Sequence, residues 1–432
     1  MEKFFKMSAR GTNVRREIVA GLTTFLAMAY ILAVNPKMLA NAGMDASGVF
    51  TATALAACIA TLVMAFTANL PIALAPGMGL NAFFAFTVVL GMGISWKTAL
   101  TAVFLEGVLF IILSFFNVRE AIINAIPSNL KKAVAAGIGL FICFIGFQNA
   151  GIIVNNDATL VGLGNLTQGP AAVAMIGLAL TAVLYALKIP GSILIGILVT
   201  TLIGIPFGVT SVPANWTPVS MPAAPLLFQF DFSRIFTLDF FAVFFTFLFV
   251  DIFDTVGTLV GVSSEAHLMD ANGNVPRVKQ ALLSDAIGTV AGACLGTSTV
   301  TSYVESTAGV AAGGRTGMTA LTTGVLFLLA LFLSPLFLLV PGAATAPALI
   351  IVGFLMLKAV TGINFNDVTE GLSAFITIVM MPFAYSIAEG IVWGIITYVF
   401  MKAATGKAKS IPVVTWILFV IFILRLILTS RA

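Results

Sequence analysis

The sequence predicts an all-α polytopic membrane protein of about 14 transmembrane segments in two inverted repeats of seven. Three observations support this fold class. The 432 residues are 60% hydrophobic and only 9% charged, which is too few charged side chains for the surface of a water-soluble protein of this length. Apolar runs of about 18 or more residues recur throughout the chain. Two further runs, one in each half, are interrupted by Gly, Pro, Ser or Thr.

Each continuous apolar run is long enough to cross a bilayer core of about 30 Å as a helix. In the first half these runs lie near 17–36, 49–70, 97–117, 132–150, 170–188 and 190–208. In the second half they lie near 238–262, 279–296, 317–339, 345–361, 369–385 and 387–404. A final apolar stretch, 411–424, falls outside this scheme, and the sequence leaves open whether it is an interfacial helix or an additional span.

The interrupted runs are 71–91, with Asn81 near its centre, and 297–315, with Glu305 near its centre. Neither suits a continuous transmembrane helix, so we expect an extended stretch followed by a short half-helix, with short strands and half-helices in segments 3 and 10. With the six continuous runs, each half then has seven elements, and the interrupted one is third. An odd number of spans makes the halves enter the membrane in opposite senses. This pattern predicts an inverted-repeat secondary transporter whose binding site lies at the paired breaks.

Basic residues of the N-terminus and of three loops lie on one side of the predicted membrane. They are Lys3, Lys6, Arg10, Arg15, Arg16, Arg119, Lys131, Lys132, Arg277, Lys279, Lys402, Lys407 and Lys409. With a cytoplasmic N-terminus all of them fall inside, as the positive-inside rule requires, whereas the opposite loop 151–169 has no basic residue. This distribution accounts for the net charge of +4 without nucleic-acid binding. We therefore expect a multi-pass protein of the cell membrane.

Carboxylates occur within or beside the predicted spans, where a charged side chain costs at least about 2.5–3.5 kcal/mol on insertion scales. Three of them, each alone in its span, suit a structural hydrogen bond as well as a role in transport: Glu106, Asp285 and Glu389. Asp251 and Asp254 are three residues apart and therefore share a helix face. Two like charges this close in low dielectric cannot both stay ionised cheaply, so the pair suits proton uptake and release. We expect Gly257 and Gly261, which follow, to let another helix approach closely.

A half-helix beginning at Glu305 would direct free backbone N–H groups toward the membrane midplane, and Asn81 occupies a comparable place after "APGMG". Two carboxylates, an amide and backbone donors suit a planar, neutral ligand with several N–H and C=O groups. A large anion would need Arg or Lys, and we expect the one nearby cation, Arg315, at the end of the half-helix. A phenylalanine beside these positions could stack on a planar ring: Phe83, Phe84 or Phe253.

Four motifs resemble the nucleobase–cation symporter-2 (nucleobase–ascorbate transporter) superfamily, most closely its adenine/guanine/hypoxanthine permease branch. They are "TTFLAMAYILAVNP" (23–36), "APGMGLNAFFA" (75–85), "FVDIFDTVGTLVG" (249–261) and "TSTVTSYVESTAGVAAGGRTG" (297–317). The resemblance spans essentially the whole chain and implies fourteen segments, with paired antiparallel strands before the third and tenth half-helices. It also implies a core domain and a gate domain. The core parts would be 1–117 and 238–340, and the gate parts 118–237 and 341–432.

The resemblance further implies that an acidic residue of the eighth segment and one of the tenth bind the base. In this chain they are Asp254, with Asp251 as the alternative, and Glu305. Asn81 matches an asparagine that contributes in the purine branch. Proton coupling belongs to the eighth-segment acids, so Asp251 and Asp254 divide binding and coupling between them, and which does which stays open. The remaining residues of the expected substrate site are Phe253 and Thr258.

We therefore expect a secondary transporter that imports purine bases (adenine, guanine, hypoxanthine) by proton symport, through an elevator-like movement of core against gate. One alternative is an anion transporter of the sulfate/bicarbonate type on the same fold. Another is a Na⁺-coupled uracil/xanthine permease, which Ser306 and Thr258 disfavour because those branches carry Asn at the first position and often His or Asp at the second. The preferred purine and the coupling ion stay open.

Other classes of protein fit the sequence less well. A channel would need a continuous polar stripe along several helices. An enzyme would need a nucleophile–base pair or a metal cluster, and the three cysteines lie in apolar segments without CxxC spacing. We expect no enzyme activity, no metal and no cofactor besides the coupled proton. The expected partners are the purine base, the lipid bilayer and, in a possible homodimer, a second copy of the chain.

Overall fold

The structure is a computed structural model that describes residues 2–115, 127–269 and 275–429. Arg119, one of the basic residues used to predict orientation, lies outside the described residues. The chain divides into two compact units, one of Met1–Phe115 with Ile145–Ile351 and the other of Phe116–Phe144 with Val352–Ala432. The predicted four-part division into core and gate segments remains a prediction.

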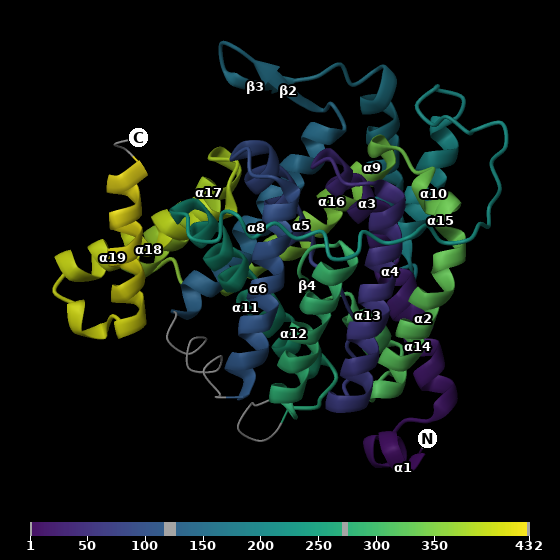
Figure 1. Ribbon diagram of the computed structural model, residues 1–432, viewed down its shortest axis with the longest axis horizontal. Helices are drawn as coiled ribbons and strands as arrows, with labels where there is room; N and C mark the ends of the chain where they lie inside the picture. Colours follow the sequence, from purple (N-terminus) through teal and green to yellow (C-terminus); the bar gives the residue numbers. More distant parts are fainter. Residues whose placement is uncertain (1, 116–126, 270–274, 430–432) are drawn as a thin grey trace. The chain divides into compact units, whose positions relative to one another are not determined.

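Every predicted continuous span has a helical counterpart among the described residues (Figure 1). In the first half the helices are α2 (Val14–Met28), α3 (Ile31–Asn41), α4 (Ala46–Val63), α6 (Trp96–Phe115), α8 (Ser128–Asn149), α9 (Gly169–Ala186) and α10 (Ser192–Gly204). In the second half they are α11 (Leu238–Glu265), α12 (Val278–Leu295), α14 (Gly317–Ala330), α15 (Ser334–Leu338), α16 (Gly342–Leu357), α17 (Val368–Phe383) and α18 (Ile387–Ala404). In the described part of the chain, nine helical stretches are long and apolar enough to cross a membrane.

The two interrupted runs fold as predicted. The first is strand β1 (Leu74–Pro76), the short helix α5 (Met78–Ala82) and a π-helical continuation, Phe83–Gly91. The second is strand β4 (Val300–Ser302) and the short helix α13 (Ser306–Ala311). β1 and β4 pair antiparallel, with Ala75 opposite Thr301. Membrane interiors offer no water to hydrogen-bond, so two short extended stretches must satisfy each other's backbone groups.

Small residues allow the helices of the first unit to pack closely around this strand pair. A Cβ atom added to Gly288 of α12 would lie 2.6 Å from the Cβ of Ala60 in α4, and one added to Gly21 of α2 would lie 2.6 Å from the carbonyl oxygen of Thr319 in α14. The prediction for α11 is wrong. A Cβ at Gly257 or Gly261 would meet nothing within 4 Å, so neither glycine is required for close helix packing among the described residues.

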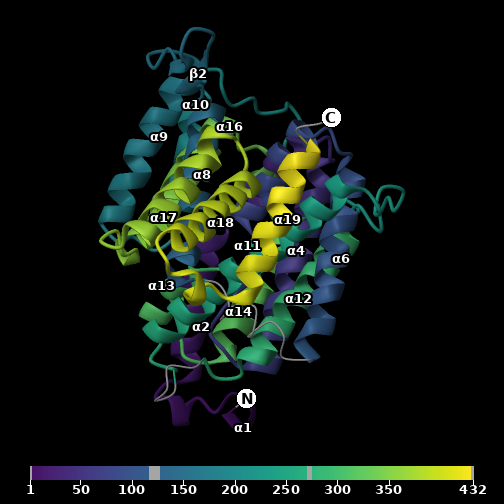
Figure 2. The same ribbon diagram turned by 90° about the vertical axis from the view of Figure 1, so that its left-hand side faces the viewer.

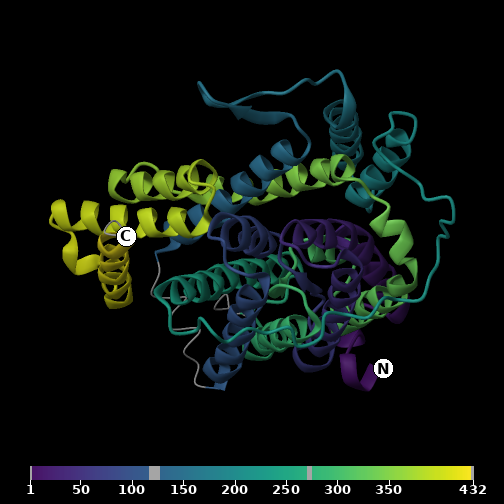
Figure 3. The ribbon, with the colours of Figure 1, turned by 45° about the horizontal axis from the view of Figure 1, so that its top comes forward.

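Long connections of the first unit also carry structure. The segment 151–169, which the sequence predicts as a loop, contains a hairpin of β2 (Ile153–Asn156) and β3 (Leu160–Leu163). The connection between α10 and α11 runs along the outside of the unit (Figure 3). It is anchored by hydrogen bonds from Phe228 N to Cys294 O, 2.9 Å, and from the Thr98 hydroxyl to Asp231 Oδ2, 2.9 Å.

In the second unit, α17 and α18 lie side by side (Figure 2). The described part of α8 in this unit approaches α16 at backbone distance, since a Cβ at Gly139 would lie 2.6 Å from the carbonyl oxygen of Gly353. The C-terminal apolar stretch forms a further helix, α19 (Val413–Thr429). With 17 residues it lies at the lower limit of the length that spans a bilayer, so the interfacial helix and the additional span both remain predictions.

Candidate functional site

The candidate site lies where the strand pair meets the short helices α5 and α13. Gly77 is the N-cap residue of α5, and its N–H donates to the carbonyl oxygen of Thr299 at 3.0 Å. A Cβ atom added to Gly77 would lie 2.6 Å from Thr301 Cγ2 and 3.6 Å from Asp254 Oδ2. Asp254 of α11 therefore reaches the β1–β4 strand pair, and glycine at position 77 leaves room for Thr301.

Glu305 lies at the N-cap position of α13, but its side chain makes no capping hydrogen bond there. The hydroxyl of Tyr30 donates instead to Glu305 Oε1 at 2.5 Å. Asp254 is close enough to Glu305 and to Asp285 to interact with both electrostatically. Asp254 and Glu305 are each partly exposed as residues.

Asn81 links the two interrupted segments. The hydroxyl of Ser298 donates to Asn81 Oδ1, and Asn81 Nδ2 donates weakly to the carbonyl oxygen of Pro76 at 3.4 Å. The same carbonyl accepts a hydrogen bond from the Tyr303 hydroxyl at 2.5 Å. The Asn81 side chain is fully buried, and its hydrogen bonds connect the two interrupted segments next to the β1–β4 strand pair.

Asp251 differs from Asp254 in burial, although the two share a helix face. It is fully buried, and its Oδ1 lies 3.3 Å from the hydroxyl of Thr255. The same hydroxyl lies 2.7 Å from Asp285 Oδ1 and 2.8 Å from the hydroxyl of Thr301. A single hydroxyl thus connects a carboxylate of α11, a carboxylate of α12 and strand β4.

The structure includes residues that the sequence analysis did not place at the site. Asp285 and Glu106 are each alone in their predicted spans, yet Asp285 hydrogen-bonds with Thr255, and Glu106 Oε2 accepts a hydrogen bond from Thr299 at 2.9 Å. Tyr30 was missed although it lies inside the motif "TTFLAMAYILAVNP". Its hydroxyl is the one polar side-chain group in the apolar run 25–34, "FLAMAYILAV", a signal that could have drawn attention to it.

Other predicted residues lie elsewhere or outside the description. Phe83 and Phe84 are fully buried and pack on Phe247, with ring centroids 4.9 and 6.3 Å away, so they belong to the packed interior. The side chain of Phe253 lies outside the described residues. Thr258 is buried, with 8% of its surface exposed. Arg315 donates to the carbonyl oxygens of Val310 and Gly314, at the end of α13 as predicted.

The last predicted intramembrane carboxylate, Glu389, lies away from the strand pair in sequence and belongs to the second unit. It lies in the first turn of α18, where its N–H donates to the capping hydroxyl of Ser386 at 3.3 Å. No group of three or more His, Cys, Asp or Glu side chains within the described ranges is arranged to hold a metal ion.

Comparisons with known proteins agree over nearly the whole length. The sequence profile of the Permease family matches residues 15–416. The chain is 49% identical to the guanine/hypoxanthine permease PbuG of Bacillus subtilis, over 99% of each chain. It is 45% identical to the adenine permease AdeP of Escherichia coli, over 99% of this chain and 96% of that one.

Solved structures share the fold at low sequence identity. The transmembrane domain of the cyanobacterial bicarbonate transporter BicA matches 87% of this chain and 97% of its own, with a TM-score of 0.65 and 15% identity. The murine anion transporter Slc26a9 matches 90% of this chain and 68% of its own, with a TM-score of 0.62 and 12% identity. These similarities confirm the inverted-repeat fold class and carry no information on the substrate.

Proposed function

This chain belongs to the Permease family, within the nucleobase–cation symporter-2 superfamily that its motifs resemble, and from this premise we propose that it imports purine bases by proton symport. The relatives named above are adenine and guanine/hypoxanthine permeases, and their 45–49% identity extends over the entire transport unit. Substrate class tends to follow such full-length similarity more closely than it follows fold.

One observation carries the proposal: Asp254 and Glu305, from different helices of the second half, are brought together at the crossing of β1 and β4, and both are partly exposed. Two carboxylates that lie near each other can accept hydrogen bonds from two N–H groups of one planar ring. The N-terminal end of α5 supplies backbone N–H groups for ring acceptors, whereas the first N–H groups of α13 donate to the carbonyl oxygens of Tyr303, Val304 and Glu305. We assign Asp254 and Glu305 to the base and Asn81 to its orientation, with Phe253 and Thr258 completing the site.

The anion-transporter alternative would require a cation facing the ends of the short helices. Arg315 is the basic residue near α13, and its guanidinium donates to two backbone carbonyls at the far end of that helix. The groups that face the crossing are carboxylates, hydroxyls and an amide. The carboxylates would repel sulfate or bicarbonate and attract the N–H edge of a neutral base.

For coupling, we assign the proton to Asp251 with Asp254. Asp251 is fully buried and connected through Thr255 to Asp285, so an added proton could move along hydroxyl and carboxylate oxygens without reaching the base. Protonation would remove charge from the interior and so favour movement of the loaded core past the gate. We further propose a cytoplasmic N-terminus, a location in the cell membrane and a homodimeric assembly.

Uptake of radiolabelled hypoxanthine, adenine, guanine, uracil and xanthine tests the proposal in cells that lack their own permeases. Wild type is run with and without a protonophore, beside Asp254→Asn and Glu305→Gln. Each substitution removes a charged hydrogen bond of about 1.5–3 kcal/mol, which corresponds to a loss of affinity of roughly tenfold or more. Asp239→Asn, at an exposed position of the same helix α11, is the matched control. No nucleobase uptake by well-expressed wild type would refute the proposal.

A further inference from the structure

Tyr30 occupies an irregular turn in the first transmembrane segment. α2 ends at Met28 and α3 begins at Ile31, and between them the backbone tightens, with Leu32 N donating to Ala29 O and Ala33 N donating to Tyr30 O. These are i to i−3 hydrogen bonds, typical of a 3₁₀ turn. The turn breaks the regular course of the segment at the residue whose hydroxyl reaches Glu305.

Helix α2 is fixed against α13 and α14 along its length. Five hydrogen bonds reach the buried carboxylate of Glu17 from the backbone and side chains of Arg315, Thr316 and Thr319, at 2.6–3.3 Å. Further along α2, Ala20 and Thr24 contact Gly309 of α13. A Cβ atom added to Gly309 would collide with the Thr24 side chain and lie 2.7 Å from the Ala20 carbonyl oxygen. The position of Tyr30 relative to α13 is therefore set by packing.

The Tyr30 side chain is fully buried, whereas Glu305 is partly exposed. The buried Tyr30 hydroxyl therefore donates its 2.5 Å hydrogen bond to one carboxylate oxygen of Glu305, Oε1. A glutamate has three side-chain torsions, and fixing one carboxylate oxygen removes most of that freedom before a ligand arrives. The carboxylate is then held in a defined direction before it meets the ligand.

We propose that Tyr30 is a positioning residue of the substrate site, which holds the Glu305 carboxylate in the orientation that accepts an N–H group of the base. This inference rests on the proposed function of Glu305 and extends it to the first segment. Tyr30 acts through Glu305 and does not itself touch the base. A purely structural tyrosine would instead affect folding or expression and leave the affinity of the folded transporter unchanged.

The test is a double-mutant cycle in the uptake assay, with Tyr30→Phe, Glu305→Gln and the double variant, supported by binding of radiolabelled base to the purified full-length protein. We expect Tyr30→Phe to raise KM and Kd about tenfold, the effect of one hydrogen bond, while the maximal rate stays within about twofold. Because both substitutions break the same interaction, the double variant should bind no more weakly than Glu305→Gln alone. Tyr398→Phe, at a buried tyrosine of α18 in the second unit, is the control for loss of a buried phenol and should match wild type.

Glu305→Asp provides a second arm that does not need Tyr30→Phe to fold. Its carboxylate is one methylene shorter and falls out of reach of Tyr30, so its KM should rise although its charge is kept. Wild-type KM in Tyr30→Phe, additive losses in the double variant or wild-type KM in Glu305→Asp would each overturn the inference. Wild type that takes up no base would refute the proposed function, and the inference with it, whereas the first three outcomes refute the inference alone.

Discussion

The hydroxyl of Thr255 lies 2.7 Å from Asp285 Oδ1 and 3.3 Å from Asp251 Oδ1, so one side chain of α11 connects two fully buried carboxylates on adjacent helices. One hydroxyl carries one proton and can donate to only one of these oxygens at a time. The cluster is therefore a place where the location of a proton changes the local hydrogen bonding.

Thr255→Val should separate coupling from binding. Valine keeps the shape of threonine but removes the hydroxyl, which leaves buried acceptors with one hydrogen bond fewer at a cost of about 1–3 kcal/mol. We expect normal base binding by the purified protein but a smaller accumulation of base driven by an imposed pH gradient. Thr246→Val, which removes a hydroxyl that bonds the Ala242 carbonyl in the same helix, is the control. Equal gradient-driven accumulation in both variants would contradict a role for the cluster in coupling.

Gly77→Ala should impair transport through crowding. The new methyl group would lie 2.6 Å from Thr301 Cγ2, which is closer than packed carbon atoms allow, and 3.6 Å from Asp254 Oδ2. The strand pair would have to shift, so we expect uptake to fall at least about tenfold, since misplacing a binding group by even 1 Å is costly.

Gly257→Ala on α11 is the matched control for that substitution, because its methyl group meets nothing within 4 Å. Replacing a mid-helix glycine with alanine should raise stability by up to about 1 kcal/mol and leave uptake unchanged. If both alanine variants lost uptake to the same degree, the close contact at Gly77 would not be the reason.

Glu17→Gln should destabilise the first unit. The buried carboxylate accepts five hydrogen bonds at the start of α14, and an amide would place donors against donors. We expect a loss of about 1–3 kcal/mol, seen as a lower Tm of the detergent-purified protein. Glu265→Gln, at an exposed position near the end of α11, should change stability by less than about 0.5 kcal/mol. Equal Tm values for the two variants would show that the Glu17 hydrogen bonds contribute little.

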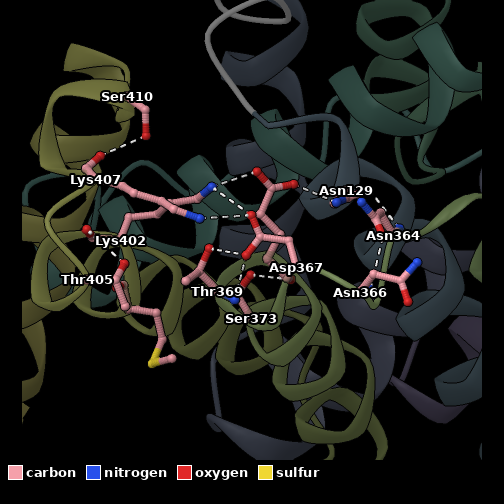
Figure 4. A network of polar contacts seen from close by, with 12 residues as sticks. Asn129, Asn364, Asn366, Asp367, Thr369, Ser373, Lys402, Thr405, Lys407 and Ser410 are labelled. Carbon is pink, nitrogen blue, oxygen red and sulfur yellow. Dashed lines mark hydrogen bonds and ion pairs between the residues drawn. The ribbon is translucent and has the colours of Figure 1, made fainter.

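A polar network ties together the second unit (Figure 4). Lys402 Nζ lies 2.8 Å from Glu370 Oε1 and 3.6 Å from Asp367 Oδ2, and Asn129 Nδ2 donates to Glu370 Oε2 at 2.6 Å. The lysine is buried while both carboxylates are partly exposed, so Lys402→Met should cost less than breaking a fully buried pair, about 1–2 kcal/mol. Lys409→Met, at an exposed position, is the control for charge loss and should leave Tm unchanged.

Asp367 makes the stability of the second unit depend on pH. Hydrogen bonds from the hydroxyl and N–H of Thr369, together with Lys402 and Lys407, hold the pKa of Asp367 well below its ordinary value. Its stabilisation is therefore present above the unfolded-state pKa of about 4 and is lost as pH falls through the folded-state pKa. We expect Asp367→Asn to have a lower Tm than wild type at neutral pH and the gap to narrow below about pH 4. Parallel Tm curves from pH 7 to 3 would contradict this assignment.

The fold class, the spans and the two interrupted segments could all be predicted from the sequence. Apolar length is what a bilayer selects, so 387–404 could be read directly as the helix Ile387–Ala404. The Gly, Pro and Ser/Thr residues around Asn81 and Glu305 prevented a continuous helix, and the structure confirms a strand and a short helix at each place. These properties depend on neighbours along the chain and on the solvent.

Which side chains contact one another depends on the tertiary structure. Asp251 and Asp254 have equivalent places in the sequence pattern, yet Asp251 is buried beside Thr255 whereas Asp254 lies near Gly77. The difference arises because burial depends on what packs against each turn of α11. The glycines at 257 and 261 resemble a packing motif but face open space, while Gly77 lies in close contact with Thr301. Tyr30 and Glu305 are 275 residues apart, and no local pattern encodes a contact over that separation. Only the antiparallel pairing of β1 with β4 and the packing of α2 on α13 bring such residues to one place.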